Sequence, residues 1–207
     1  MIQIPGTLSD EIKSVIKENC LEGEQGWSHG EYEEDTIVGD FLGNLRTGKT
    51  ISTANKNIYE WEIVYKKFHG RGINPLEKET GADGIITFEI SDQTRNIKTV
   101  KPIIFQAKKK GNYNDLKEQT SKMNQIAKNG NFVLRLTPDG YFAKQDDNKQ
   151  KRIGDFLVDD FLACKTGIEG MTFDPIRKQL KFETLDLIHF EISQRLSIKV
   201  DKLQDFR

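Results

Sequence analysis

The sequence has little that would fix it in an oxidising compartment or in a membrane. Only two of its 207 residues are cysteine, Cys20 and Cys164, so we expect neither a disulfide framework nor a zinc knuckle. No apolar run is long enough to cross a membrane, and residues 1–5 have neither the basic nor the apolar region of a signal peptide. These absences predict a cytoplasmic protein with no membrane partner.

An excess of positive charge is also missing. The chain has 31 Lys and Arg residues against 32 Asp and Glu residues, which gives a net charge of -1. This balance provides no global attraction to a polyanion, so any binding of nucleic acid must come from a local basic face. The length suffices for one domain with a sizeable core.

Two apolar runs rich in Ile and Phe lie near the middle of the sequence, within residues 81–90 and 102–110. Each run stops at charged or turn-forming residues, so each is predicted to be a largely buried strand. The interval 91–99 is too polar for a core and is predicted to be a hairpin loop.

The predicted hairpin brings three polar side chains together. We fold it with Ile90 opposite Val100, within an uncertainty of one residue in register. The far end of the hairpin then carries Gln106 and Lys108 beside Asp83. Burying a charge beside apolar strands is costly unless the charge is paired or binds a metal. Asp83 and Lys108 are therefore expected either to form a structural ion pair or to flank a site.

A third acid lies upstream, on a predicted helix over residues 31–46. That helix carries an apolar stripe at helical spacing, formed by Ile37, Val38, Phe41, Leu42 and Leu45. At about 100° per residue, Glu34 lies near the centre of the stripe, whereas Glu31 and Asp35 lie at its edges. The helix macrodipole explains several acids in a first turn, but it does not explain one on the buried face.

Together these residues resemble the PD-(D/E)xK nuclease superfamily, which has the restriction-endonuclease-like fold. The resemblance rests on a helix-borne Glu34, on Asp83 at the start of a strand, and on Gln106-Ala107-Lys108 at the end of the next strand. More narrowly, the chain looks like the Gln-x-Lys variants, such as Mrr-like restriction enzymes and the nuclease domains of bacterial antiphage systems. The likeness covers residues 30–164. Gly81-Ala82 stands where Pro is often found, and Gln106 replaces the usual Asp or Glu.

The resemblance implies a DNA endonuclease that hydrolyses phosphodiester bonds in bacterial defence or restriction. It also implies that Glu34, Asp83 and Gln106 hold Mg²⁺ or Mn²⁺ and that Lys108 helps to organise the attacking water. The donor types agree with this, because Mg²⁺ is typically held by one or two carboxylates together with substrate phosphate. Gln106 offers only a neutral carbonyl oxygen, so we expect weaker metal binding than a Glu would give.

Nearby basic residues are the predicted DNA contacts. Lys109 and Lys110 extend a positive strip beyond the site, and Lys67 and Arg71 precede it in the sequence. All four suit phosphate contacts, although an ordinary solvated loop explains Lys67 and Arg71 equally well. A homodimer is compatible with this interpretation, since many nucleases need two sites to cut two strands, and so is a sensor or regulatory partner protein.

The remaining pattern predicts an α/β fold with a mixed central β-sheet flanked by helices. We divide the chain into an N-terminal helix and loop (1–29), a nuclease core (30–164) and a C-terminal β-rich extension of the same domain (165–207). Further helices are expected over residues 7–19, 114–129 and 153–164, and further strands over residues 58–68, 132–136, 141–144, 178–187 and 188–200. Residues 47–57 are expected to be a mobile connection. Residues 201–207 are expected to begin a helix that then stops, which would suit a chain that is a piece of a longer protein.

Two other functions stay open at this point. The first is a non-catalytic module on the same scaffold that binds nucleic acid or supports assembly, with Asp83 and Lys108 as a structural pair. The second is an NTPase, because residues 43–50 fit the Walker A spacing and end in Lys49 and Thr50. A phosphate-binding loop leaves a strand and opens a helix, whereas this match follows a predicted helix, so the NTPase is the minority interpretation.

Overall fold

The computed structural model describes residues 4–29, 33–67, 80–145, 150–168, 171–174, 179–182, 188–189 and 194–205. Its centre is an eight-stranded mixed sheet with the strand order β1-β2-β11-β3-β4-β5-β6-β7. These strands are β1 (Thr50–Ala54), β2 (Asn57–Lys67), β3 (Gly84–Asp92), β4 (Ile97–Lys109), β5 (Asn131–Thr137), β6 (Gly140–Lys144), β7 (Lys151–Arg152) and β11 (Gln194–Asp205). The expected mixed α/β architecture is confirmed.

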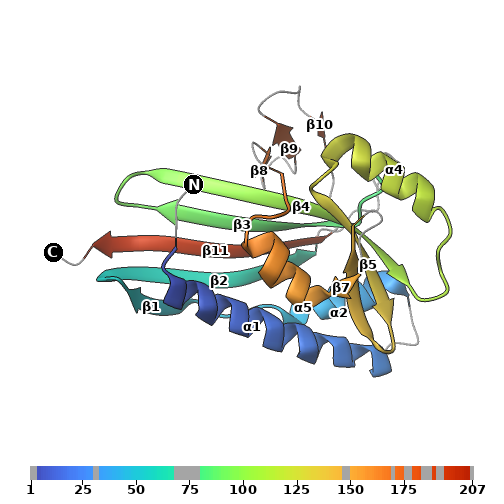
Figure 1. Cartoon of the computed structure of the whole chain (residues 1–207), viewed down its shortest axis with the longest axis horizontal. Coiled ribbons are helices and arrows are strands. Elements are labelled where there is room, and N and C mark those ends of the chain that lie inside the picture. Colours follow the sequence, from blue (N-terminus) through green and yellow to red (C-terminus); the bar gives the residue numbers. More distant parts are fainter. Residues whose placement is uncertain are drawn as a thin grey trace.

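Helices lie on both faces of this sheet (Figure 1). One face carries α1 (Gly6–Glu24), α2 (Glu34–Asn44) and the short α5 (Ile153–Phe156), which continues as the π-helix η2 (Leu157–Leu162). The other face carries α4 (Leu116–Ala127). A 3₁₀ helix, η1 (Gln25–His29), follows α1, and a small sheet contains β8 (Met171–Asp174), β9 (Gln179–Phe182) and β10 (Ile188–His189).

Alternation along β4 divides the core between these two faces. Ile103, Phe105 and Ala107 belong to the larger cluster, which includes buried residues of α1, α2 and α5. Ile104 points the other way and packs with Met123 of α4 in a smaller cluster. Gln106 and Lys108 share the parity of Ile104, so β4 directs them to the α4 face.

The structure corrects two expectations about strands. Residues 47–57, expected to be a mobile connection, contain β1, which pairs antiparallel with β2. Its polar sequence suits an edge strand, because only one of its sides is paired and alternate residues are exposed. Residues 201–205, expected to begin a helix, continue β11 along β2.

The segment expected as a C-terminal extension supplies a central strand. β11 lies between β2 and β3, antiparallel to the first and parallel to the second. Leu196, Ile198 and Val200 are fully buried there, in the same cluster as the helices of the first face. The sheet is therefore complete only when residues 194–205 are in place.

A buried ion pair joins β3 to β11 on the α4 face. Arg195 Nη2 donates to Glu89 Oε1 at 2.7 Å, and Glu89 is only 6% exposed. Lys98 Nζ lies 3.1 Å from Glu89 Oε2, and Thr87 Oγ1 donates to Glu89 Oε1 at 2.9 Å. Burial by itself raises the pKa of Glu89, but Arg195 and Lys98 outweigh it, so the pKa lies below its ordinary value.

This pair should make the fold less stable in acid. A carboxyl whose pKa is lowered by folding contributes its full stability above the ordinary Glu pKa of about 4.3, and that stability is lost as the pH falls through the folded-state value. We expect the free energy of unfolding, measured by urea titration, to decrease between about pH 5 and pH 3, and to decrease less steeply in Glu89→Gln. Glu118→Gln, which removes an exposed pair with Lys122, is the control and should change the slope little. An unchanged slope in Glu89→Gln would contradict the assignment.

Candidate functional site

The candidate site lies where β4 runs past the start of β3. Pairing of the two strands begins with Gly84 opposite Phe105, and the Asp83 backbone N–H donates to the Phe105 carbonyl at 2.8 Å. Alternate residues of a strand direct their N–H groups to the same neighbour, so the amides of Ala107 and Lys109 point to the side that β3 has left. Buried backbone donors need an acceptor, and β3 provides none at this level.

Two carboxylates take the place of the missing strand. The N–H of Ala107 donates to Asp83 Oδ2 at 2.7 Å, and the N–H of Lys109 donates to Glu34 Oε2 at 2.5 Å. Because a strand rises by about 3.3 Å per residue, the two amides lie roughly 6.6 Å apart. The structure therefore brings the two acids, which come from separate segments, to neighbouring positions on one sheet edge.

Gln106 lies beside Asp83 and is 1% exposed. Its Nε2 donates to Asp83 Oδ2 at 2.6 Å and to the Ala107 carbonyl at 3.2 Å. Its Oε1 is buried, and among the described residues it has no hydrogen-bond partner. An unsatisfied buried amide oxygen costs about 1–3 kcal/mol, so a ligand that binds this atom would relieve a cost that the described residues leave in place.

The hairpin register differs by one residue from the predicted one, within the stated uncertainty. Ile90 pairs with Thr99, whereas the sequence analysis placed it opposite Val100. The observed register sets Gln106 across from Asp83. The amide and the carboxylate are thus direct cross-strand neighbours, which explains their short contact.

Lys108 is 6% exposed and projects from β4 on the same face as Gln106. Within the described ranges no ion pair joins it to a carboxylate, so the structural pair with Asp83 considered above is not formed there. Asp83 Oδ2 instead accepts hydrogen bonds from two amide donors. The side chain of Lys108 is largely buried while no carboxylate of the described ranges pairs with its ammonium, which leaves that group available to a ligand.

A second network fixes the beginning of α2, where Glu34 is the first residue. Asp35 Oδ2 accepts a hydrogen bond from Lys67 Nζ at 2.6 Å, and Asp35 Oδ1 accepts one from Gln194 Nε2 at 2.7 Å. The Tyr65 hydroxyl donates to Gln194 Oε1 at 3.1 Å, and burial raises the pKa of Tyr65 to about 12. The first turn of α2 is thereby tied to β2 and β11, and the macrodipole favours both of its acids.

Sequence reasoning missed the part played by two of these residues. Asp35 lies at the edge of the apolar stripe, and that position was the available signal. Gln194 gave no signal, because its contact with Asp35 depends on where β11 enters the sheet.

A glycine lets α4 approach the loop that carries Asp83. Gly81 has a φ of +70°, and a Cβ there would lie 2.4 Å from the Gln119 carbonyl oxygen. A side chain at this position would clash with the α4 backbone, and this φ strains any residue other than glycine. The backbone of α4 therefore contacts the segment two residues before Asp83.

The predicted DNA contacts are partly engaged by the chain itself. Lys67 pairs with Asp35, and Lys110 Nζ lies 3.7 Å from Asp139 Oδ2. Lys109 Nζ lies 5.2 Å from the centroid of the Trp27 ring. Arg71, like the alternative acid Glu31, lies outside the described residues. Their contacts with DNA stay predictions.

The segment that fits the Walker A spacing has its neighbouring helix and strand in the opposite order from a phosphate-binding loop. Residues 43–50 connect the end of α2 to β1, so a helix precedes the segment and a strand follows it. Lys49 Nζ lies 2.7 Å from Glu60 Oε1, a contact that raises the pKa of Lys49. Both observations disfavour the NTPase.

The donor set at the sheet edge fits a hydrated Mg²⁺ ion. Glu34 and Asp83 offer carboxylate oxygens and Gln106 offers its unsatisfied Oε1, all of them hard donors. No group of three or more His, Cys, Asp or Glu side chains placed to hold a metal occurs in the described part of the chain. Such an ion would therefore depend on water and substrate phosphate for its other ligands.

The capping role of Asp83 can be tested by two substitutions. Asp83→Ala leaves the Ala107 N–H without its acceptor and should lower the free energy of unfolding by about 1–3 kcal/mol. Asp83→Asn keeps an oxygen that can accept this hydrogen bond, so it should lower that free energy by less than about 1 kcal/mol. Urea denaturation of both variants beside the wild-type protein measures the difference. Equal stability of Asp83→Ala and wild type would contradict the capping role.

The chain was also compared with protein-family models, with curated proteins and with solved structures, and none of them matches. No helix among the described residues is long and apolar enough to cross a membrane. A function for the chain therefore has to be inferred from its own residues and their geometry.

Proposed function

We propose that the chain is a metal-dependent DNA endonuclease of the PD-(D/E)xK type, with a restriction-endonuclease-like fold and a role in bacterial defence or restriction. The observation that carries the proposal is the meeting of Asp83, Gln106 and Lys108: the Gln106 amide contacts Asp83 and keeps a buried Oε1 without a partner among the described residues, and the largely buried Lys108 projects on the same face. The unsatisfied Gln106 oxygen is unfavourable unless a ligand binds it. Glu34 on the same edge adds a second carboxylate.

Glu34, Asp83 and Gln106 are the residues that would hold Mg²⁺ or Mn²⁺. When bound, such an ion lowers the pKa of a water ligand and neutralises charge on the phosphate. Lys108 has three N–H donors, so it can hold the attacking water and stabilise negative charge that develops on a phosphate oxygen. Gln106 leaves the site one charge less negative than a Glu would, which eases the approach of an anionic substrate.

Further partners belong to the same proposal. Lys109, Lys110, Lys67 and Arg71 would contact phosphates near the cut. A homodimer would present two such sites to two strands, and a sensor or regulatory protein would control when they act.

One observation favours the alternative of a non-catalytic module that binds nucleic acid. Asp83 and Glu34 both accept backbone hydrogen bonds at the edge of β4, so each has a structural role even without a metal. A module of this kind would bind DNA in the absence of divalent ions and would not cut it.

Plasmid cleavage separates the two functions. With Mg²⁺ present, we expect the wild-type protein to nick or linearise supercoiled DNA, and Asp83→Asn and Lys108→Met to cut at least about 100-fold more slowly, because each loses a group that stabilises the transition state. Lys56→Ala, an exposed lysine in the turn between β1 and β2, should cut like wild type. Circular dichroism confirms that each variant is folded. Equal cutting by wild type and both site variants would rule out the endonuclease.

Gln106→Glu tests the metal site without relying on activity. The new carboxylate would face Asp83 at the place where Gln106 Nε2 now lies 2.6 Å from Oδ2, and two like charges at this distance repel. We expect the melting temperature of the variant to fall below that of wild type in EDTA and to recover in millimolar Mg²⁺. Gln106→Met, which removes the oxygen donor at similar length, is the control. A melting temperature of Gln106→Glu that does not respond to Mg²⁺ would contradict a metal site at these residues.

A further inference from the structure

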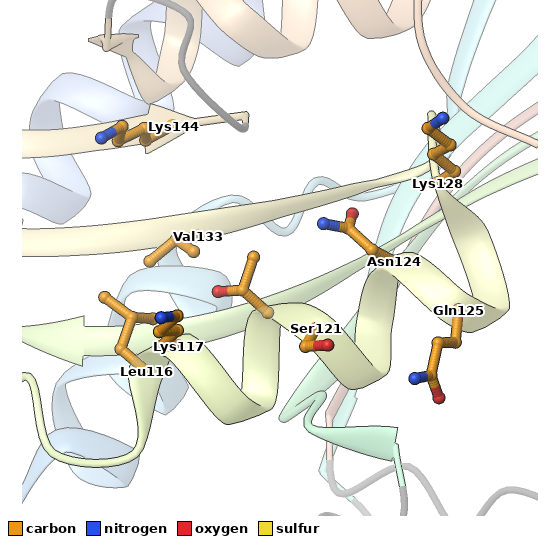
Figure 2. A pocket seen from close by; sticks show the side chains of 9 residues that line it. Leu116, Lys117, Ser121, Asn124, Gln125, Lys128, Val133 and Lys144 are labelled. Carbon is orange, nitrogen blue, oxygen red and sulfur yellow. The ribbon is translucent and has the colours of Figure 1, made fainter.

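A basic groove lies between α4 and the strands β5 and β6 (Figure 2). Its volume is about 850 Å³, and three lysines line it: Lys117 of α4, Lys128 at the end of α4, and Lys144 of β6. Among the described residues no acid lines the groove, and none of the three lysines has an ion pair there. The groove therefore carries positive charge that the described residues do not pair.

The α4 side of the groove is a continuous stripe of hydrogen-bonding side chains. Lys117, Ser121, Asn124 and Lys128 are spaced by four, three and four residues, so they lie on one face of the helix. Lys117 and Lys128 stand about 16 Å apart along the helix axis, which corresponds to about five base-pair steps of 3.4 Å along the axis of a DNA duplex. Figure 2 shows them toward opposite ends of α4, with Lys144 on the facing strand.

Sheet register connects this groove to the candidate site. Gln106 of β4 is the partner of Val133 in β5, and Val133 is the partner of Lys144 in β6. Partners in neighbouring strands share a face, and strands lie about 4.8 Å apart, so the Cα atom of Lys144 is roughly 10 Å from that of Gln106. The row that holds Asp83 and Gln106 thus continues through the floor of the groove to its basic rim.

The next row of the same face is also basic. Lys108 of β4 pairs with Arg135 of β5, whose guanidinium lies 5.1 Å from the centroid of the exposed Tyr113 ring. Both rows therefore carry positive charge on this face, the first at Lys144 and the second at Lys108 and Arg135. The net charge of the whole chain is -1, so this is a local basic face and not a general excess.

We propose that this groove binds the phosphate backbone of the DNA strand whose scissile phosphate occupies the Asp83–Gln106–Lys108 site. This inference rests on the proposed endonuclease function and names the path that its substrate takes. Lysines neutralise the phosphates, and the hydroxyl and amide groups of α4 donate hydrogen bonds to them. None of the groove lysines is among the contacts predicted from the sequence.

The test is DNA binding by a charge-reversed groove, measured without divalent metal. Lys117→Glu/Lys144→Glu is compared with Lys13→Glu/Lys56→Glu, which changes the net charge equally but lies on α1 and in the β1–β2 turn, away from the groove. A fluorescent duplex oligonucleotide is titrated in EDTA at several salt concentrations. We expect the groove variant to bind at least about tenfold more weakly and its salt slope to fall by about 2, because each phosphate contact contributes about 0.9. The control should keep the wild-type slope.

The outcomes separate this inference from the proposed function. A groove variant that binds like wild type, or no more weakly than the control variant, overturns the groove, whether or not the wild-type protein cuts plasmid. Groove-dependent binding by a wild-type protein that does not cut supports the groove and overturns cleavage. Polyglutamate and unlabelled DNA are also compared as competitors at equal charge. If polyglutamate displaces the oligonucleotide as effectively as DNA does, the groove is assigned to acidic peptides and the nucleic-acid proposal is overturned. Matching thermal melts confirm that both variants are folded.

Discussion

Two unpaired amides at the edge of β4 set the organisation of this protein. β3 stops pairing at Gly84, β4 continues to Lys109, and the backbone donors of Ala107 and Lys109 would be buried without acceptors. Carboxylates from two segments that are distant in the sequence, Asp83 and Glu34, accept these hydrogen bonds. The start of α2 and the residue just before β3 are thereby held beside β4. Stability and the proposed chemistry therefore depend on the same oxygen atoms.

An edge is also the place where side chains from both faces of a sheet can meet. α2 packs with the larger core on one face, while Gln106 and Lys108 project to the α4 face. In the middle of the sheet the strands would separate these groups. Where β3 is absent, Glu34 reaches the backbone of β4 from its own side, at the amide two residues beyond the one that donates to Asp83. A gap in strand pairing thus assembles the site.

Local sequence was enough to predict the hairpin, the helix that carries Glu34 and the meeting of Asp83 with Gln106, because apolar periodicity and a short loop constrain them. The prediction of a connection over residues 47–57 was wrong, because a polar edge strand has the same composition as a connecting loop. The contact of Asp35 with Gln194 joins residues 159 positions apart, and no local pattern encodes it. The basic groove was missed for a related reason: Lys117, Lys128 and Lys144 are scattered in the sequence and converge only when α4 packs beside β5 and β6.

The central place of β11 has a consequence for biosynthesis. While a ribosome is still adding residues before about 194, β2 and β3 lack the strand that separates them, and Asp35 lacks the glutamine that helps to hold α2. A nascent chain can form the hairpin early, yet it cannot position Glu34 firmly against it. The candidate site would thus be complete only after translation has passed this strand, and a chain terminated before β11 would lack it.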